Sequence, residues 1–353
     1  MRHGKTLQEL AAEIDRQSKS KRDFVAPATR LSMVNGLDNL LFRLEGNTDT
    51  TSFGIRPSMH DQLATRLEIP RAYYDRMRTK QPALLTENVN TWLSTSPNRY
   101  MVRTLDGQAR ALLSDRYRPL DNIDLAESVL PKLLELGVNI ESCEITESRL
   151  YVKAVTPRIT AEVSPGDVVQ AGLMVSNSEI GMGAIKIEPL VYRLVCANGA
   201  VINEMAARKT HVGRRHTFLE LENADQYFRD ETRMADDHAF WMKVQDLVAA
   251  TLNGTTFQNI VTRWQEAKAQ KITADPVAVV ERTAKRFGFG DMERASVLTH
   301  LIAGHELSAY GLMNAVTRTA QDVESYDRST ELERLGPQIL ELPRTEWRAL
   351  AEV

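Results

Sequence analysis

The spacing of apolar residues changes along the chain, and the change predicts where strands give way to helices. Between about residues 84 and 215, short apolar runs alternate with turn signals, a pattern typical of strands. From Thr217 onward, apolar residues recur with the helical period, as in Phe240, Val244, Leu247 and Val248. Strands and helices segregated in this way favour an α+β fold. We therefore expect a β-rich middle with an antiparallel or mixed sheet and some helices, followed by a helical C-terminal region.

The same pattern divides the chain into three predicted segments. Residues 1–50 read as a polar N-terminal arm with a first strand, 51–216 as an α+β core domain, and 217–353 as a helical C-terminal region. Within the arm, apolar positions from Leu7 to Ile14 predict one short helix. The polar cluster SKSKR that follows, at 18–22, is expected to be mobile.

Residues 51–80 predict a strand followed by two helices. The first helix is expected near Ser58–Leu67, with Ser58 as its N-cap, and the second after Pro70. Glu68 stands where the turn of a helix-turn-helix usually has glycine. The pattern therefore favours a plain helical hairpin over a DNA-docking unit.

Turn residues separate the elements of the middle and C-terminal segments. The dipeptide Asp106–Gly107 predicts a β-hairpin, and Asp121–Asn122 and Gly137 predict the two ends of a helix. The segment KIEPLVYRLV, at 186–195, breaks strict alternation and reads as a bent strand or a strand-to-helix transition. Further strands are expected at Ile140–Ile145, Arg149–Val155, Val168–Val175 and Ala184–Cys196, and further helices near Thr256–Lys271, Pro276–Phe287 and Met292–Thr319.

Composition narrows the class of protein. Of 353 residues, 42% are hydrophobic and 26% charged, and the formal net charge is −3, which excludes a polyanion binder that is basic over its whole length. The two cysteines, Cys143 and Cys196, form no CxxC motif and indicate reduced thiols. No apolar run approaches the roughly 18 residues of a membrane span, and the N-terminus does not read as a signal peptide. These features predict a cytoplasmic protein without a membrane partner.

The densest basic cluster is RKTHVGRRH, at 208–216. It places four cations in nine residues without a carboxylate, namely Arg208, Lys209, Arg214 and Arg215. Such clusters bind phosphates because each cation neutralises one charge and releases a counterion. The alternative is an exposed loop whose charges are solvated.

A second basic motif is SDRYRPLDN, at 114–122. Tyr117 between Arg116 and Arg118 suits an aromatic ring that stacks on a base of single-stranded nucleic acid. The alternative is a structural network in which the arginines pair with Asp115, Asp121 or Asp124.

No motif predicts catalysis, and we assign no catalytic residue, metal ligand or cofactor. His211 and His216 lack further ligands nearby, and His300 and His305–Glu306 do not follow the HExxH order. The loop at 175–187 contains GxG without the rest of a dinucleotide-binding motif, and neither a phosphate-binding P-loop nor a GxSxG motif occurs.

Taken in order, several motifs resemble a known family. These are QLATRLEIPRAYYDRM, NTWLSTSPNRYMVRTLDGQARALLSDRYRPLDN, SNSEIGMGAIKIEPLVYRLVCANGAV, KTHVGRRH and YGLMNAVTRTAQDVESYDRSTELERLG. Across roughly residues 50–340 the chain resembles the phage- and plasmid-borne family called domain of unknown function 932. Members often carry an NSHDG-like stretch where this chain has Asn177–Gly181. The resemblance implies an accessory protein of a mobile element.

These observations lead to a functional hypothesis. We expect a homo-oligomeric nucleic-acid-binding accessory protein of a phage or plasmid that holds single-stranded DNA in recombination or replication. Its expected contacts share a basic or aromatic side chain, and they are Arg116, Tyr117, Arg118, Lys186, Arg193, Arg208, Lys209, Arg214 and Arg215, with Tyr192 as a second stacking ring. The hypothesis requires that these residues converge on one furrow. The alternatives are a protein-interaction or structural component without catalysis, and a phosphoryl-processing enzyme that uses Asp115, Asp121 and His211.

Overall fold

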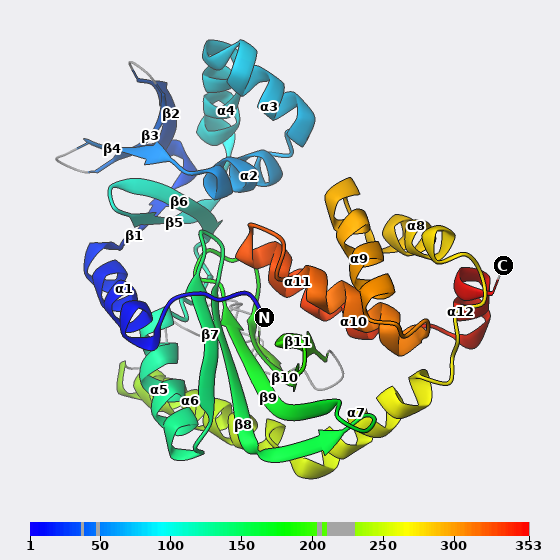
Figure 1. The fold of residues 1–353 in the computed structure, drawn as a ribbon. Helices are drawn as coiled ribbons and strands as arrows, with labels where there is room; N and C mark the ends of the chain where they lie inside the picture. The colour runs from blue at the N-terminus through cyan, green and yellow to red at the C-terminus, as the bar shows by residue number, and fades with distance from the viewer. Residues whose placement is uncertain (37–38, 47–49, 203–206, 210–229, 353) are drawn as a thin grey trace.

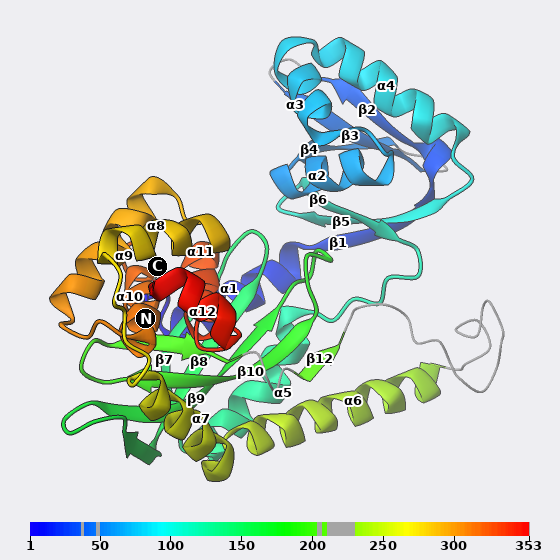
Figure 2. The ribbon, with the colours of Figure 1, turned by 90° about the vertical axis from the view of Figure 1, so that its right-hand side faces the viewer.

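The computed structural model describes residues 1–353 except 37–38, 47–49, 203–206, 210–229 and 353. The chain forms two lobes, each built on its own sheet (Figures 1 and 2). Helices dominate after residue 230. The α+β class with a β-rich middle and a helical C-terminal region is confirmed.

The first lobe contains the sheet β1-β5-β6-β4-β3-β2, in which β4 and β6 are parallel and the other neighbours antiparallel. Its strands are β1 (Arg22–Pro27), β2 (Leu31–Asn35), β3 (Leu40–Glu45), β4 (Thr50–Ile55), β5 (Arg99–Leu105) and β6 (Gln108–Ser114). Helices α2 (Pro57–Arg66), α3 (Arg71–Lys80) and α4 (Pro82–Thr95) pack on it around Met33, Phe42 and Leu63. Strands from both sides of residue 50 pair here, so the segment boundary predicted there lies inside a sheet.

Local signals in this lobe had mixed outcomes. Asp106 and Gly107 both have positive φ, of 54° and 71°, and the hairpin between β5 and β6 is confirmed. Glu68 has φ 54°, so it takes the left-handed conformation that glycine usually supplies. The N-cap prediction for Ser58 is wrong, because α2 begins at Pro57 and the Ser58 hydroxyl donates to the carbonyl of Arg110 at 2.7 Å.

The second lobe contains the antiparallel sheet β11-β10-β9-β8-β7, with β12 also paired to β10. The strands are β7 (Asn139–Ile145), β8 (Leu150–Glu162), β9 (Val168–Asn177), β10 (Ile185–Arg193), β11 (Asn198–Val201) and β12 (Ala207–Lys209). The segment 186–195 is therefore a strand up to Arg193. Helices α1 (Leu7–Ser20), α5 (Asn122–Glu135) and α6 (Asp230–Thr251) pack on one face around Ile185 and Ile187.

The C-terminal helices pack on the remaining parts of this sheet. They are α7 (Gly254–Ala267), α8 (Pro276–Phe287), α9 (Asp291–Ala303), α10 (Ala309–Thr319), α11 (Tyr326–Gln338) and α12 (Arg344–Ala351). Most of them enclose one core around Val191 and Trp264, while Tyr326 of α11 packs over Tyr151 on the face opposite α6. Lys153 of β8 and Glu333 of α11 are fully buried and form an ion pair of 2.5 Å that joins this helix to the sheet.

Three predictions in the α-helical parts need correction. The segment 18–22 is the end of α1 and the start of β1, and Lys21 forms an ion pair with Asp121, so it is not the mobile link that its polarity suggested. The helix expected at Met292–Thr319 is two helices, because Gly304 ends α9 and His305 has φ 50°. Leu247 does not share the buried face of α6 and is 41% exposed.

Other expectations concern the thiols and the membrane. Cys143 and Cys196 are both free, the first buried and the second half-buried. Of the helices that the structure describes, none combines the length and the apolar character needed to cross a membrane.

The strained residue between α9 and α10 gives a first prediction. Replacing His305, at φ 50°, by glycine should raise the free energy of unfolding by about 1 kcal/mol, because glycine adopts this conformation without a Cβ clash. Replacing the exposed Ala295 inside α9 by glycine should lower it by about 1 kcal/mol. Urea denaturation of both variants measures the two effects, and shifts of the same sign would contradict the assignment of strain.

Candidate functional site

The linker between the lobes, residues 115–121, carries three of the predicted contacts. Arg116 is exposed, and Arg118 pairs with Asp236 of α6 at 3.3 Å. The Tyr117 hydroxyl donates to the carbonyls of Ser178 and Glu179 at 3.4 and 3.3 Å, and burial raises its pKa. Tyr117 is thus held by backbone carbonyls of the second lobe. Arg118 pairs with a carboxylate, but not with one of the three that the alternative interpretation named.

Lys186 and Arg118 lie on opposite faces of the second sheet. Ile185 and Ile187, its neighbours along β10, pack toward α5 and α6, so alternation turns Lys186 to the other face. There its Nζ lies 3.9 Å from Glu188. Because Arg118 is paired with α6, these two cations cannot line the same furrow.

Arg193 lies at the far end of the same strand. It is seven residues beyond Lys186, about 23 Å in an extended chain. Its Nε donates to Asp167 at 2.5 Å, and the Tyr310 hydroxyl donates to the same carboxylate at 2.8 Å. Arg193 therefore holds the loop before β9, while Tyr192 packs partly buried beside Leu190.

The basic cluster 208–216 is described only in part. The backbone of Arg208 pairs with Lys186, and that of Lys209 with Ile185, between β12 and β10. Arg214, Arg215, His211 and His216 lie outside the described residues, so phosphate binding by this cluster stays a prediction. Of the members whose side chains the structure describes, Arg118, Lys186 and Arg193 do not gather on one surface.

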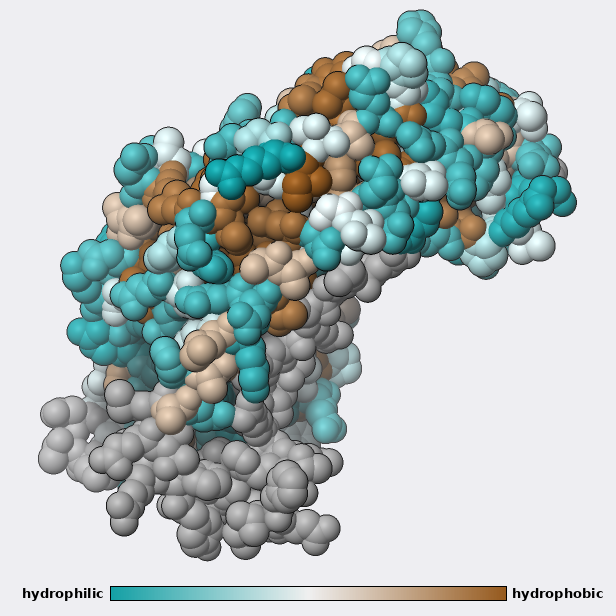
Figure 3. Space-filling model, turned by 90° about the horizontal axis from the view of Figure 1, so that it is seen from below, coloured by the Kyte–Doolittle hydropathy of each residue, from teal (hydrophilic) through white to brown (hydrophobic). Residues whose placement is uncertain are grey.

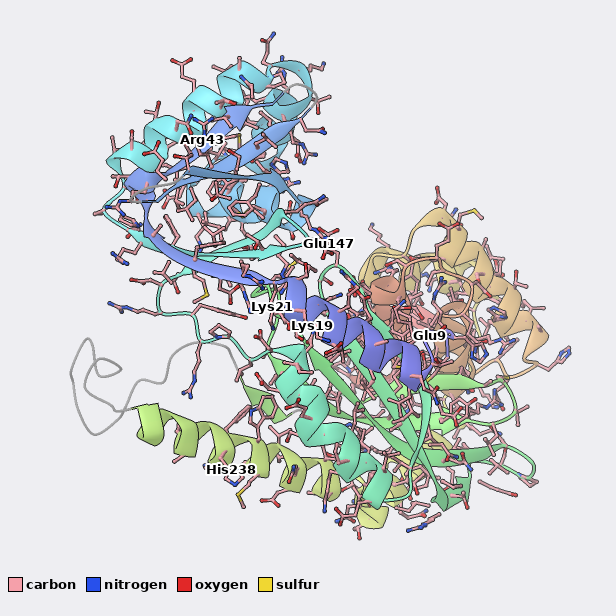
Figure 4. The ribbon with its side chains drawn as sticks, turned by 90° about the vertical axis from the view of Figure 1, so that its left-hand side faces the viewer. Glu9, Lys19, Lys21, Arg43, Glu147 and His238 are labelled. Atoms are coloured by element: carbon pink, nitrogen blue, oxygen red, sulfur yellow. The ribbon has the colours of Figure 1, made fainter. Side chains whose placement is uncertain are left out.

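A different set of charges meets between the lobes, and we call it the interlobe charge cluster: Lys21, Arg103, Arg110, Asp121 and Glu179. Arg103 of β5 has no exposed surface. Its guanidinium donates to Asp121 at 2.7 Å, to Asp23 at 3.0 Å and to the carbonyl of Glu179 at 2.7 Å. One side chain of the first sheet thus holds the start of α5 and the loop after β9 (Figure 4 marks Lys21 at this junction).

Glu179 is the acidic centre of the cluster. Its Oε2 lies 2.5 Å from Arg110 of β6, and its Oε1 accepts from the backbone N–H of Asn122 at 2.7 Å and lies 3.4 Å from Lys21. The preceding Asn177 donates to the carbonyl of Leu120 and to Asn122. Relatives were expected to carry NSHDG at Asn177–Gly181. In this chain, the charged residue of that stretch, Glu179, is buried and holds the two lobes together.

The electrostatics of the cluster favour ionised carboxylates. Burial alone would raise the pKa of Asp121, but Arg103 and Lys21 hold it below its usual value. Burial likewise opposes ionisation of Glu179, and the Arg110 guanidinium is the main cause of its lowered pKa. Both carboxylates are committed to structural cations. Asp121, proposed above for phosphoryl chemistry, is thus engaged, and Asp115 is exposed.

The first lobe also has an open groove, which we call the aromatic groove, of about 590 Å³. It lies between the turn joining α2 to α3, helix α4 and the start of β5. Two aromatic side chains stand exposed along it, Tyr73 at 47% and Trp92 at 52%. Its other lining residues are Arg66, Leu67, Glu68, Ile69, Pro70, Asn88, Thr95, Ser96, Asn98 and Tyr100.

The polar groups of the aromatic groove leave hydrogen-bonding capacity for a ligand. The Asn88 Oδ1 atom is buried and has no hydrogen-bond partner within the described part of the chain. Arg66 is exposed and forms no ion pair with any described residue, whereas Arg71 pairs with Asp61 and Asp75. Glu68 is the one carboxylate among the lining residues and is exposed.

Sequence reasoning missed both features, although each left a signal. Arg103 and Arg110 interrupt the apolar strands YMVRTL and ARALL, and a charged residue within a buried strand implies a buried partner. Tyr73 lies in the second helix predicted at 51–80 and Trp92 in a motif used for the family resemblance, and neither was considered as a binding residue. Among the described residues, no three His, Cys, Asp or Glu side chains gather as metal ligands would.

Comparisons with known proteins give one match. The family model described as Domain of unknown function (DUF932) matches residues 110–337, more than half of the chain. No curated protein and no solved structure matches. The matched range contains Arg110, Asp121 and Glu179 of the interlobe charge cluster, and the aromatic groove lies before it.

Removing the central carboxylate tests the interlobe charge cluster. Glu179→Gln should lower the free energy of unfolding by about 3–5 kcal/mol, because it leaves the buried Arg110 without its counter-charge, while Lys21 keeps Asp121. Glu135→Gln, at a side chain 69% exposed that pairs with Lys132, is the control and should change it by less than about 1 kcal/mol. Urea denaturation that gave equal effects for both would refute the structural role.

Acidification gives a second test of the cluster. Because the folded-state pKa values of Asp121 and Glu179 are lowered, their contribution is full above the unfolded values of about 4 and is lost as pH falls through the folded values. The stability difference between the wild type and Glu179→Gln should therefore be constant above about pH 5 and shrink as the pH falls from about 5 toward 2. A difference that stays constant in urea titrations across this range would show that Glu179 does not titrate in this way.

Proposed function

The chain belongs to the family called domain of unknown function 932, and we propose that it is a nucleic-acid-binding accessory protein that holds single-stranded DNA in its aromatic groove. One observation carries the proposal: Tyr73 and Trp92, on different helices, both expose their rings along the same groove. The phage or plasmid setting is part of this proposal and is what the family resemblance implies.

Exposed aromatic rings suit unpaired bases. Every base has a flat π-face, so stacking on tyrosine or tryptophan tolerates any sequence and contributes about 1–3 kcal/mol per base. Bases in a duplex are already stacked, and therefore the groove should prefer single strands. Asn88, whose buried Oδ1 lacks a partner, can accept from a base amino group.

The charges around the groove suit a phosphate backbone with one exception. Arg66 lies on the rim, Arg99 follows Asn98 in the exposed start of β5, and neither forms an ion pair in the described ranges. The first lobe, residues 22–114, contains twelve Lys and Arg against nine Asp and Glu, a net charge of +3 in a chain of −3. Glu68 repels a polyanion and should weaken its binding. Binding of this kind needs no cofactor.

Tryptophan fluorescence offers a direct test of the proposal. Trp92 is the most exposed tryptophan, whereas Trp264 and Trp347 are buried and Trp241 is half-buried. An oligothymidine of about 15 nucleotides should quench this emission at about 50 mM salt, where phosphate contacts are strong. Tyr73→Ala should weaken binding about tenfold through the loss of one stacking ring, with Met292→Ala, at an 85% exposed residue of α9, as the control.

Charge variants at the rim sharpen the same titration. Glu68→Gln should tighten binding, and Arg66→Gln should weaken it and reduce the slope of log K against log salt by about 0.7, the value for one phosphate contact on a single strand. If the oligonucleotide does not bind, or binds the wild type and Tyr73→Ala equally, the aromatic groove is not the binding site. Capture of a protein partner after nuclease treatment would then favour the non-catalytic interaction component.

A further inference from the structure

Helix α6 has apolar residues outside its buried stripe. Phe240, Val244 and Val248 are buried against α5 and the second sheet. Met242, on the far side of the helix, is 53% exposed, and Leu247, at the border of the buried stripe, is 41% exposed. On the neighbouring α5, Leu134 is 59% exposed, and seen from below, apolar side chains interrupt the hydrophilic surface (Figure 3).

The exposed residues of α6 are arranged symmetrically about one point. Counted outward from the bond between Val244 and Gln245, like or complementary residues occupy equal distances on both sides. These pairs are Ala239 with Ala250, Met242 with Leu247, and Lys243 with Asp246, and all six residues are exposed. On a helical wheel at 100° per residue, the two alanines and the two charged residues lie at the centre of this exposed face. Met242 lies at the edge away from the buried stripe, and Leu247 lies at the other edge, beside Phe240.

This symmetry has a consequence for an antiparallel helix pair. A two-fold axis through the midpoint brings each residue level with its mirror position on the other copy. Lys243 then faces Asp246 of the second copy, and Asp246 faces Lys243, so both ion pairs form at once. Within the described part of the chain, neither Lys243 nor Asp246 has an ion-pair partner.

We propose that a second copy of this chain docks on α6 in antiparallel orientation. Ala239 and Ala250 at the centre of the face permit close approach of the two helices, and Met242 and Leu247 close the interface along its two flanks. Leu134 of α5 extends the apolar area at one side. The charge arrangement favours a self-pairing surface, because a surface for a different protein has no reason to be complementary to itself under a two-fold rotation.

The proposal does not depend on nucleic-acid binding, because α6 and the aromatic groove belong to different lobes. Sedimentation equilibrium of the full chain at about 50 mM salt should show a dimer in the micromolar range typical of small interfaces. Lys243→Asp and Asp246→Lys should each raise the dissociation constant about tenfold or more, because like charges then face each other. The double variant K243D/D246K should restore the wild-type value to within about threefold.

Two further variants show whether a loss of dimer comes from the docking face or from general damage to the fold. Met242→Asp should dissociate the dimer, and Met292→Asp, at the exposed residue on α9, should leave it intact. Circular dichroism should show unchanged helix content in each variant. A wild type that is monomeric at about 100 µM would overturn the proposal, as would a dimer that the single charge variants do not weaken or the double variant does not restore.

Discussion

The contact between Arg103 and the loop at Glu179 determines how the two sheets stand to each other. A buried guanidinium is costly unless each of its donors finds an acceptor. Arg103 finds them in both lobes: Asp23 in its own sheet, and Asp121 and the Glu179 carbonyl in the second lobe. The Glu179 carboxylate, from the second lobe, forms an ion pair with Arg110 of the first sheet. Because these ion pairs and hydrogen bonds join residues of both lobes, the lobes are held in one arrangement.

Strand alternation explains why three of the basic residues chosen from the sequence, Arg118, Lys186 and Arg193, do not line one furrow. Lys186 lies between Ile185 and Ile187, and once those two pack against α5 and α6, its side chain must face the other way. Arg118 is held by α6 on the first of these faces, and Arg193 by Asp167 at the end of the strand. Residues that are close in sequence can thus lie apart in space, because a strand alternates its side chains between two faces and extends about 3.3 Å per residue.

Much of the fold could be predicted from local signals, and the parts that could not depend on distant partners. The Asp106–Gly107 hairpin, the helix that ends near Gly137 and the strands around them follow from turn chemistry and spacing. The first sheet was missed as a unit because β1 pairs with β5 across some seventy residues, a register that no local pattern specifies. The break at Gly304–His305 was missed because a single glycine inside a helical pattern does not by itself end a helix, and the left-handed conformation of His305 is uncommon for a residue with a Cβ. The aromatic groove could not be predicted for a similar reason. Whether Tyr73 and Trp92 are exposed depends on how the helices of the first lobe pack, and the sequence does not state this.

The proposed nucleic-acid site lies on the first lobe, before the range that the family model matches. This site differs from the one expected from the sequence in its position. It also differs in the main contacts to the single-stranded DNA, which are stacking aromatic rings rather than a row of cations. Photo-crosslinking of a bromouracil-containing oligonucleotide, followed by mass spectrometry of the peptides, locates the strand directly. The account predicts crosslinks at Tyr73 and Trp92. Crosslinks confined to residues 184–216, or none at all, would contradict it.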